Sequence, residues 1–228
     1  MKKELAVILV SGGLDSCLTA AIADQTCELA FLHLNYGQKT ELREKKAFRD
    51  IAGYYHVGYE LEVDMPYFSL IGGSSLTDKN MPVDTADLKN KDIPRSYVPF
   101  RNANILAVAT SWAEVIGAAK IYIGAVEEDS SGYPDCRDSF FKAFNLVIKE
   151  GTKPGTNIEI ITPLIHMTKK QIVKNAFELG APVHLTWSCY QNEKKACGIC
   201  DSCALRLRGF QQAGIEDPIH YVTIPSYI

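Results

Sequence analysis

No stretch of this 228-residue chain approaches the roughly 20 consecutive apolar residues that a membrane-spanning helix needs. The chain also lacks an excess of charge of one sign, because 24 basic side chains oppose 27 acidic ones for a net charge of −3. A nucleic-acid-binding surface is usually basic, so this near-balance of charge argues against a nucleic acid partner. The start, Met-Lys-Lys-Glu, leads into an apolar segment without a signal-peptide pattern. We expect a cytoplasmic protein with no membrane partner.

The seven cysteines do not form the pattern of a disulfide framework. Their number is odd and the chain is large, so free thiols or a metal site are favoured. Four of them lie close together, at Cys189, Cys197, Cys200 and Cys203. Four thiolates enclose a metal ion tetrahedrally, which predicts one structural Zn²⁺ per subunit. An iron–sulfur cluster and a redox pair at Cys197 and Cys200 are the alternatives.

Strand and helix patterns alternate along most of the chain. Strands are predicted over residues 5–10, 29–34, 59–63, 121–126 and 158–162, and helices over 17–24, 40–55, 104–116, 140–149 and 169–179. Residues 5–10 are continuously apolar, which is typical of a strand buried on both faces. The alternation predicts an α/β fold with a doubly wound parallel sheet, whose ligands bind at the carboxyl ends of the strands.

Two segments depart from this alternation. Residues 64–99 are polar, contain a Gly-Gly pair and four prolines, and show no clear period. Long stretches of this kind inside a compact domain are usually functional loops or lids. The second segment begins at Trp187 and carries the cysteine cluster and a short helix. We therefore predict an α/β domain over residues 1–186 and a zinc-binding segment over residues 187–228.

Residues 10–16, Val-Ser-Gly-Gly-Leu-Asp-Ser, directly follow the first predicted strand. The glycines let the backbone bend and approach a bound group closely. A helix is predicted to begin near Asp15 or Ser16, and its first N–H groups have no partners within the helix, so they form an anion site. The spacing and the lysine of a Walker loop are absent. The segment predicts a phosphate cradle, and an ordinary strand-to-helix turn is the alternative.

The pattern Ser-Gly-Gly-x-Asp-Ser at residues 11–16 resembles the pyrophosphate loop, or PP-loop, of the N-type ATP pyrophosphatases. Those enzymes activate a carboxylate or carbonyl oxygen by adenylation. The resemblance implies a Rossmann-like, adenine nucleotide alpha-hydrolase-like fold, with residues 1–186 as the ATP-binding domain. It implies that ATP is bound by Val10, Ser11, Gly12, Gly13, Leu14, Asp15, Ser16, Cys17 and Leu18.

Three further sequence segments indicate which family within this superfamily the chain resembles. They are Tyr-Gly-Gln at residues 36–38, Val-Pro-Phe-Arg-Asn at 98–102 and Ser-Gly-Tyr-Pro-Asp-Cys-Arg-Asp at 131–138. Together with the cysteine set, they resemble the 7-cyano-7-deazaguanine synthase family of queuosine biosynthesis over nearly the whole chain. Position 100 is usually small in that family and is Phe here. The resemblance implies catalytic or substrate-binding roles for Tyr36, Gly37, Gln38, Arg101, Asn102, Tyr133, Asp135, Arg137 and Asp138.

The resemblance also implies a reaction. ATP would activate the carboxylate of 7-carboxy-7-deazaguanine, ammonia would form an amide, and a second activation would yield the nitrile. The enzyme would be an ATP-dependent carbon–nitrogen ligase and a homodimer, with Mg²⁺ at the phosphates. The residues do not distinguish between two sets of products, AMP with pyrophosphate and ADP with phosphate.

Several of these residues have a second interpretation. Arg101 is a planar donor suited to a phosphate or carboxylate, or else an exposed arginine. Asp135 and Asp138 would accept hydrogen bonds from the N–H groups of a guanine-like ring. Alternatively, Asp138 would only cap the helix that follows it. Tyr133 stacks on a heterocycle or packs in the core. The carboxylates at residues 127–129 hold Mg²⁺ or lie in a solvated loop, which is the favoured interpretation.

Two other functions are compatible with the motifs. A tRNA-modifying thiolase or lysidine synthetase would use the same ATP chemistry, but the net charge of −3 disfavours RNA docking. A thiolase would also need a reactive cysteine pair near the ATP loop, where Cys136 is the one candidate. Alternatively, the protein would not be an enzyme. The α/β domain would then bind ATP as a sensor without hydrolysing it, and the cysteine segment would be a zinc-ribbon binding module.

Overall fold

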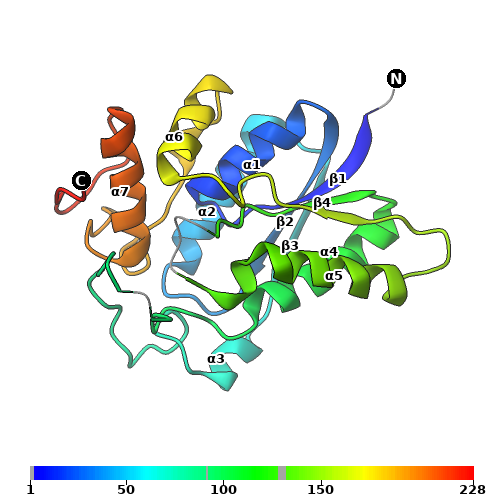
Figure 1. Cartoon of the computed structure of the whole chain (residues 1–228), viewed down its shortest axis with the longest axis horizontal. Helices are drawn as coiled ribbons and strands as arrows, with labels where there is room; N and C mark the ends of the chain where they lie inside the picture. The colour runs from blue at the N-terminus through cyan, green and yellow to red at the C-terminus, as the bar shows by residue number, and fades with distance from the viewer. Residues whose placement is uncertain (1–2, 91, 128–131) are drawn as a thin grey trace.

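The computed structural model describes residues 3–90, 92–127 and 132–228. At its centre is a parallel sheet of five strands in the order β3-β2-β1-β4-β5, which confirms the predicted α/β fold (Figure 1). The strands are β1 (Glu4–Leu9), β2 (Cys27–Asn35), β3 (Tyr59–Asp64), β4 (Lys120–Tyr122) and β5 (Glu159–Ile161). The helices are α1 (Leu14–Asp24), α2 (Glu41–Tyr55), α3 (Tyr67–Ile71), α4 (Arg101–Ile116), α5 (Asp138–Gly151), α6 (Lys169–Glu178) and α7 (Asp201–Ala213).

The central strand β1 is buried on both faces. Successive side chains on a strand point to opposite sides, so Val7 and Leu9 pack toward α4 and α5, whereas Ala6 and Ile8 pack toward α1 and α2. Figure 1 shows these two helix pairs on opposite faces of the sheet. This double coverage explains why the strand is apolar throughout rather than alternating. Cys17 and Cys27 lie in the second core, as small buried residues.

The strand order places a topological switch beside β1. The chain runs outward from β1 to β2 and β3, then returns to add β4 on the other side of β1. In open α/β sheets, ligands bind outside the carboxyl ends of the strands at this point. Leu9 ends β1 there, and α1 begins at Leu14. Within the described residues, no helix combines the length and the apolar character needed to cross a bilayer.

Helix α4 begins three residues earlier than its sequence pattern predicts. Arg101 and Asn102 therefore occupy its first turn. The backbone N–H of Asn102 donates to Asp135 Oδ2 at 2.8 Å, so a residue far along the chain caps the helix. Phe100 just before it adopts a left-handed conformation with φ of 56°. Small residues tolerate that conformation better than Phe.

The predicted strand over 121–126 is also shorter in the structure. Its ladder ends at Tyr122, and the following residues line a cavity instead. The predicted loop over 64–99 contains the short helix α3. This loop is anchored to the C-terminal segment, because Ala86 N donates to Ile199 O at 2.8 Å. The predicted capping box before α6 is confirmed, with Thr168 and Gln171 bonded reciprocally.

The segment from Trp187 onward packs tightly on the α/β domain. Trp187 N donates to Gly12 O at 2.8 Å, and α7 lies along α6. The buried Arg206 of α7 donates to both carboxylate oxygens of Asp217, at 2.6 and 2.8 Å. It also donates to Thr186 Oγ1 at 2.7 Å, so this guanidinium joins the two parts of the chain. The domain boundary at residue 187 stays a prediction.

We expect Arg206→Met to lower the free energy of unfolding by about 3–5 kcal/mol, because it leaves the carboxylate of Asp217 buried without its cation. The control is Arg49→Met, which breaks the more exposed pair with Glu62. Solvent screens that pair, so the loss should be far smaller. Denaturant unfolding of both variants measures the difference. Equal losses would contradict the assigned role of Arg206.

Candidate active site and metal centre

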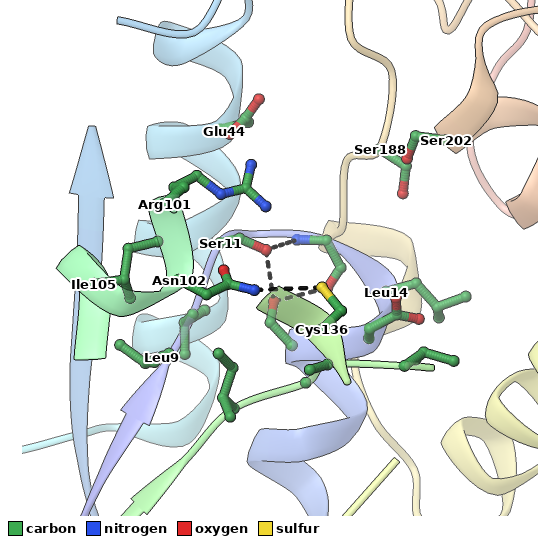
Figure 2. A pocket seen from close by; sticks show the side chains of 18 of the residues that line it. Leu9, Ser11, Leu14, Glu44, Arg101, Asn102, Ile105, Cys136, Ser188 and Ser202 are labelled. Atoms are coloured by element: carbon green, nitrogen blue, oxygen red, sulfur yellow. Dashed lines mark hydrogen bonds between the residues drawn. The ribbon is translucent and has the colours of Figure 1, made fainter. Parts of the chain in front are cut away.

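A cavity of about 280 Å³ lies at the carboxyl ends of β1 and β4, at the switch point of the sheet. Figure 2 shows it from close by. Its wall combines the loop after β1, the first turns of α1, α4 and α6, and the segment around the cysteines. The predicted site residues on this wall are Val10, Ser11, Gly13, Leu14, Asp15, Ser16, Tyr36, Arg101, Asn102 and Tyr133. The wall is therefore built from segments far apart in the sequence.

The turn at Gly12 can be made only by a residue without a side chain. Its φ is 86°, and a Cβ there would lie 2.8 Å from the backbone oxygen of Glu44 and 2.9 Å from Ala47 Cβ. Gly13 differs, because its φ is negative and the nearest atom to an added Cβ would be 3.4 Å away. Gly12 lets the loop pack against α2, and Gly13 faces the cavity.

The start of α1 is suited to an anion. No described side chain caps this helix. Its first N–H groups therefore remain available, and the helix dipole favours negative charge there. Ser11 Oγ lies 3.3 Å from Ser16 Oγ, which donates to Gly13 O at 3.0 Å (Figure 2). The phosphate-binding role of this loop stays a prediction.

Asp15 in the first turn of α1 meets a lysine that the sequence pattern did not single out. Lys169 Nζ lies 2.5 Å from Asp15 Oδ2, and the lysine side chain is only 10% exposed. The other oxygen, Oδ1, is buried and has no hydrogen-bond partner among the described residues. Lys169 opens α6, where the helix dipole disfavours a cation. That unusual position is the sequence signal that could have revealed it.

Arg101 presents an uncompensated positive charge to the cavity. Its Nη1 donates to the hydroxyl of Tyr36 at 3.1 Å, and its guanidinium lies 5.1 Å from the centre of that ring. Burial raises the pKa of Tyr36 to about 12, so the phenol is neutral at physiological pH. No carboxylate of the described residues lies within ion-pair distance of Arg101, and its Nε has no partner. These features suit a phosphate or carboxylate ligand.

Glu44 of α2 lines the same cavity and was also missed. Burial raises the pKa of its carboxyl to about 7, although hydrogen bonds from Thr40 and Gln38 act to lower it. Gln38 does not line the cavity, and its side-chain amide instead donates a hydrogen bond to the Glu44 carboxylate. Further lining residues outside the predictions include Gly124, Cys136, Trp187, Ser188 and Tyr190.

Other predicted site residues lie outside the cavity wall. Cys17 and Leu18 are fully buried in the cores behind the loop, and Gly37 packs against Ser69. Asp135 caps α4, and Asp138 pairs with Lys142 at 2.5 Å. Arg137 immediately precedes α5. Their roles in binding stay predictions.

Of the predicted carboxylate run at 127–129, Glu127 accepts from the backbone N–H of Asp138 at 2.9 Å. Glu128 and Asp129 lie outside the described residues, as does Ser131 of the segment at residues 131–138. Among the described residues, Cys136 is the one cysteine on the cavity wall. Burial raises the pKa of its thiol to about 11, so it is not an activated nucleophile, and the reactive pair that a thiolase needs is not assembled there.

The four late cysteines converge on one point. The sulfurs of Cys189, Cys197, Cys200 and Cys203 all lie within 4.8 Å of one another and are buried. The Cys197 and Cys203 sulfurs are 3.8 Å apart. Zinc–sulfur bonds in a tetrahedron imply sulfur separations of about 3.8 Å, so the set fits a single Zn²⁺. A four-iron cluster distributes its cysteines over separate irons and spaces the sulfurs more widely. All four thiols are free of disulfides.

The family model of the queuosine biosynthesis protein QueC matches residues 5–214 of this chain. The chain belongs to the QueC family. The 7-cyano-7-deazaguanine synthase of Chlorobium phaeobacteroides is 61% identical over 224 residues, which cover 98% of this chain and 99% of that protein. The enzyme of that name from Chloroherpeton thalassium is 62% identical, with the same coverage. The U34-tRNA thiolase NcsA of Methanococcus maripaludis superposes with a TM-score of 0.49 at 13% identity, over 84% of this chain and 61% of that one.

In this QueC family member, residues that line the cavity are direct chain neighbours of two of the four cysteines. Cys189 lies between Ser188 and Tyr190, which both line the cavity, and Ser202 does so next to Cys203. A metal ion that holds the four sulfurs would therefore also fix this part of the wall. The backbone N–H groups of Asn192 and Cys197 both lie 3.3 Å from Cys189 Sγ, as expected for donors to a thiolate.

We expect Gly12→Ala to lower the free energy of unfolding by roughly 2–4 kcal/mol, because the new Cβ is strained and collides with the backbone of α2. Gly13→Ala should cost less than about 1 kcal/mol, since its backbone conformation suits alanine. Thermal unfolding distinguishes the two variants. A larger loss for Gly13→Ala would refute this account of the turn.

Removal of the metal should open the cavity wall as well as destabilise the segment. We expect Cys200→Ser to lose zinc by elemental analysis and to change the fluorescence of Trp187, whose indole donates to Asn192 O at 3.0 Å. Cys27→Ser is the control, because Cys27 lies in the sheet core away from the cluster. An unchanged zinc content in Cys200→Ser would contradict the metal assignment.

Proposed function

We propose that this chain is an ATP-dependent 7-cyano-7-deazaguanine synthase of queuosine biosynthesis and that the cavity at the switch point is its active site. Relatives that carry this name match nearly the full length of the chain. The structural observation that supports the proposal most directly is the meeting of two anion sites in one cavity. These are the start of α1, which no described side chain caps, and Arg101, which has no carboxylate partner among the described residues. Together they can hold a triphosphate beside a carboxylate.

In the first half of the reaction, the loop at residues 11–16 would hold the phosphates of ATP through its N–H groups. A carboxylate oxygen of 7-carboxy-7-deazaguanine attacks the α-phosphorus, and pyrophosphate leaves. Arg101 lines this cavity and stabilises the charge that develops. Ammonia then attacks the activated carbonyl carbon and loses a proton. AMP departs with the carboxylate oxygen, leaving the amide.

The second half repeats the activation on the amide. The amide oxygen attacks the α-phosphorus of a second ATP, and pyrophosphate leaves again. Departure of AMP with this oxygen and loss of the two nitrogen-bound protons leave the nitrile. The same cavity serves both steps because each has an oxygen nucleophile, an α-phosphorus and the same developing charge. AMP and pyrophosphate follow from the resemblance of the loop to ATP pyrophosphatases.

Mg²⁺ would be held by Asp15 together with the phosphates. The unpartnered Oδ1 of Asp15 is a carboxylate oxygen of the kind that Mg²⁺ prefers, and it lies at the phosphate cradle. The ion would neutralise phosphate charge. Lys169 holds the other oxygen and fixes the direction of the carboxylate. We further propose a structural Zn²⁺ at the four cysteines, a homodimer and a cytoplasmic location, without a nucleic acid partner.

We expect Asp15→Asn to reduce nitrile formation by roughly 100-fold or more, because it removes the charge at the cradle while preserving the shape of the side chain. Asp24→Asn at the far end of α1 is the control and should retain activity. Zinc-loaded enzyme is incubated with ATP, ammonium and 7-carboxy-7-deazaguanine, and the products are identified by mass. If the unaltered enzyme formed neither amide nor nitrile, the proposed function would be wrong.

A further inference from the structure

Within the described residues, two carboxylates line the cavity, those of Asp15 and Glu44. Asp15 is engaged by Lys169 at the phosphate cradle. Glu44 has no cation within ion-pair distance among the described residues, although Arg101 lines the same cavity. The reaction as proposed uses the cradle and Arg101 and assigns nothing to Glu44. A partly buried acidic group that lines a cavity without a cationic partner is suited to a ligand that supplies hydrogen-bond donors.

The carboxylate of Glu44 is held in one orientation. Thr40 Oγ1 donates to its Oε1 at 2.7 Å, and Gln38 Nε2 donates to its Oε2 at 3.1 Å. The amide of Gln38 is itself oriented, because its Oε1 accepts from the backbone N–H of Tyr36 at 2.8 Å. Each carboxylate oxygen has a second lone pair. Glu44 therefore offers two further acceptor positions side by side, which match two adjacent N–H donors.

The order of the groups along the wall matches one edge of the substrate. In Figure 2, the side chain of Arg101 lies between Glu44 and Ser11 of the phosphate loop. Around a 7-carboxy-7-deazaguanine ring, the carboxylate is followed by the carbonyl oxygen O6, then by N1–H and the C2 amino group. If the carboxylate of the substrate points to the phosphate loop at residues 11–16, its O6 lies toward Arg101. Its two N–H donors, N1–H and the C2 amino group, then lie toward Glu44.

We propose that Glu44 binds the substrate ring by accepting hydrogen bonds from N1–H and the C2 amino group, and thereby selects a 2-amino-4-oxo ring over other deazapurines. This inference rests on the proposed function, since it places the substrate of that reaction in this cavity. It also gives the Tyr-Gly-Gln string at residues 36–38 a role. Tyr36 pairs with Arg101, and Gln38 orients Glu44.

The test compares zinc-loaded unaltered protein with Glu44→Gln and Glu41→Gln. Glu41 opens the same helix but does not line the cavity, so it is the matched control. The probes are 7-cyano-7-deazaguanine, its analogue without the 2-amino group, and a non-hydrolysable ATP analogue, each titrated by calorimetry. We expect the unaltered protein and Glu41→Gln to prefer the amino compound by roughly tenfold or more. Glu44→Gln should lose that preference and still bind the ATP analogue within about threefold of the unaltered protein.

Each result of the titration decides the inference. If Glu44→Gln kept the preference, or weakened both deazapurines equally, the assignment of Glu44 would be overturned while the proposed function stood. If the unaltered protein bound the ATP analogue but neither deazapurine, the proposed function itself would fail. A crystal structure of the unaltered protein with bound 7-cyano-7-deazaguanine provides a second test, which does not require any variant to fold. It should place Glu44 within about 3.2 Å of N1 or the amino nitrogen, and a ring bound elsewhere would refute the inference.

Discussion

The close packing of the Gly12 turn against α2 is the constraint on which the rest of the site depends. A side chain at this position would collide with the backbone of Glu44, so the loop reaches α2 only through glycine. The same turn accepts a hydrogen bond from Trp187 at the start of the cysteine segment. One backbone turn thus positions the loop at residues 11–16 relative to Glu44 and to the segment that carries the four cysteines.

The cysteine segment forms part of the cavity wall rather than an appendage beside it. It supplies Ser188 and Tyr190 to the cavity wall, on either side of a metal-binding cysteine. A segment this short is too small to bury a core of its own, so it holds such a position only through other contacts. Four thiolates around one ion and the buried Arg206–Asp217 pair provide that stability. The proposed structural zinc is therefore tied to the shape of the substrate site.

Charge is distributed unevenly over the cavity wall. Lys169 and Asp15 neutralise each other at the cradle, whereas Arg101 and Glu44 lack ion-pair partners among the described residues. Burial keeps Tyr36 neutral, so it positions Arg101 without cancelling its charge. A ligand group that displaced water from this wall would interact with Arg101 and Glu44 more strongly than it does in bulk water. A substrate with an anionic end and a donor edge satisfies both.

The sequence by itself determined the parts of this protein whose signals are local. The glycine turn after an apolar strand, the strand–helix alternation and the spacing of the four cysteines each lie within a short window, and all appear in the structure. The tertiary structure decided the rest. Lys169 meets Asp15 across 154 residues, and Glu44 reaches the cavity because α2 packs on the loop. The unfavourable position of Lys169 at a helix start is a local signal, but it does not name Asp15 as the partner. Glu44 leaves no such signal, because a charged residue on a helix resembles any solvated one until the helices are packed.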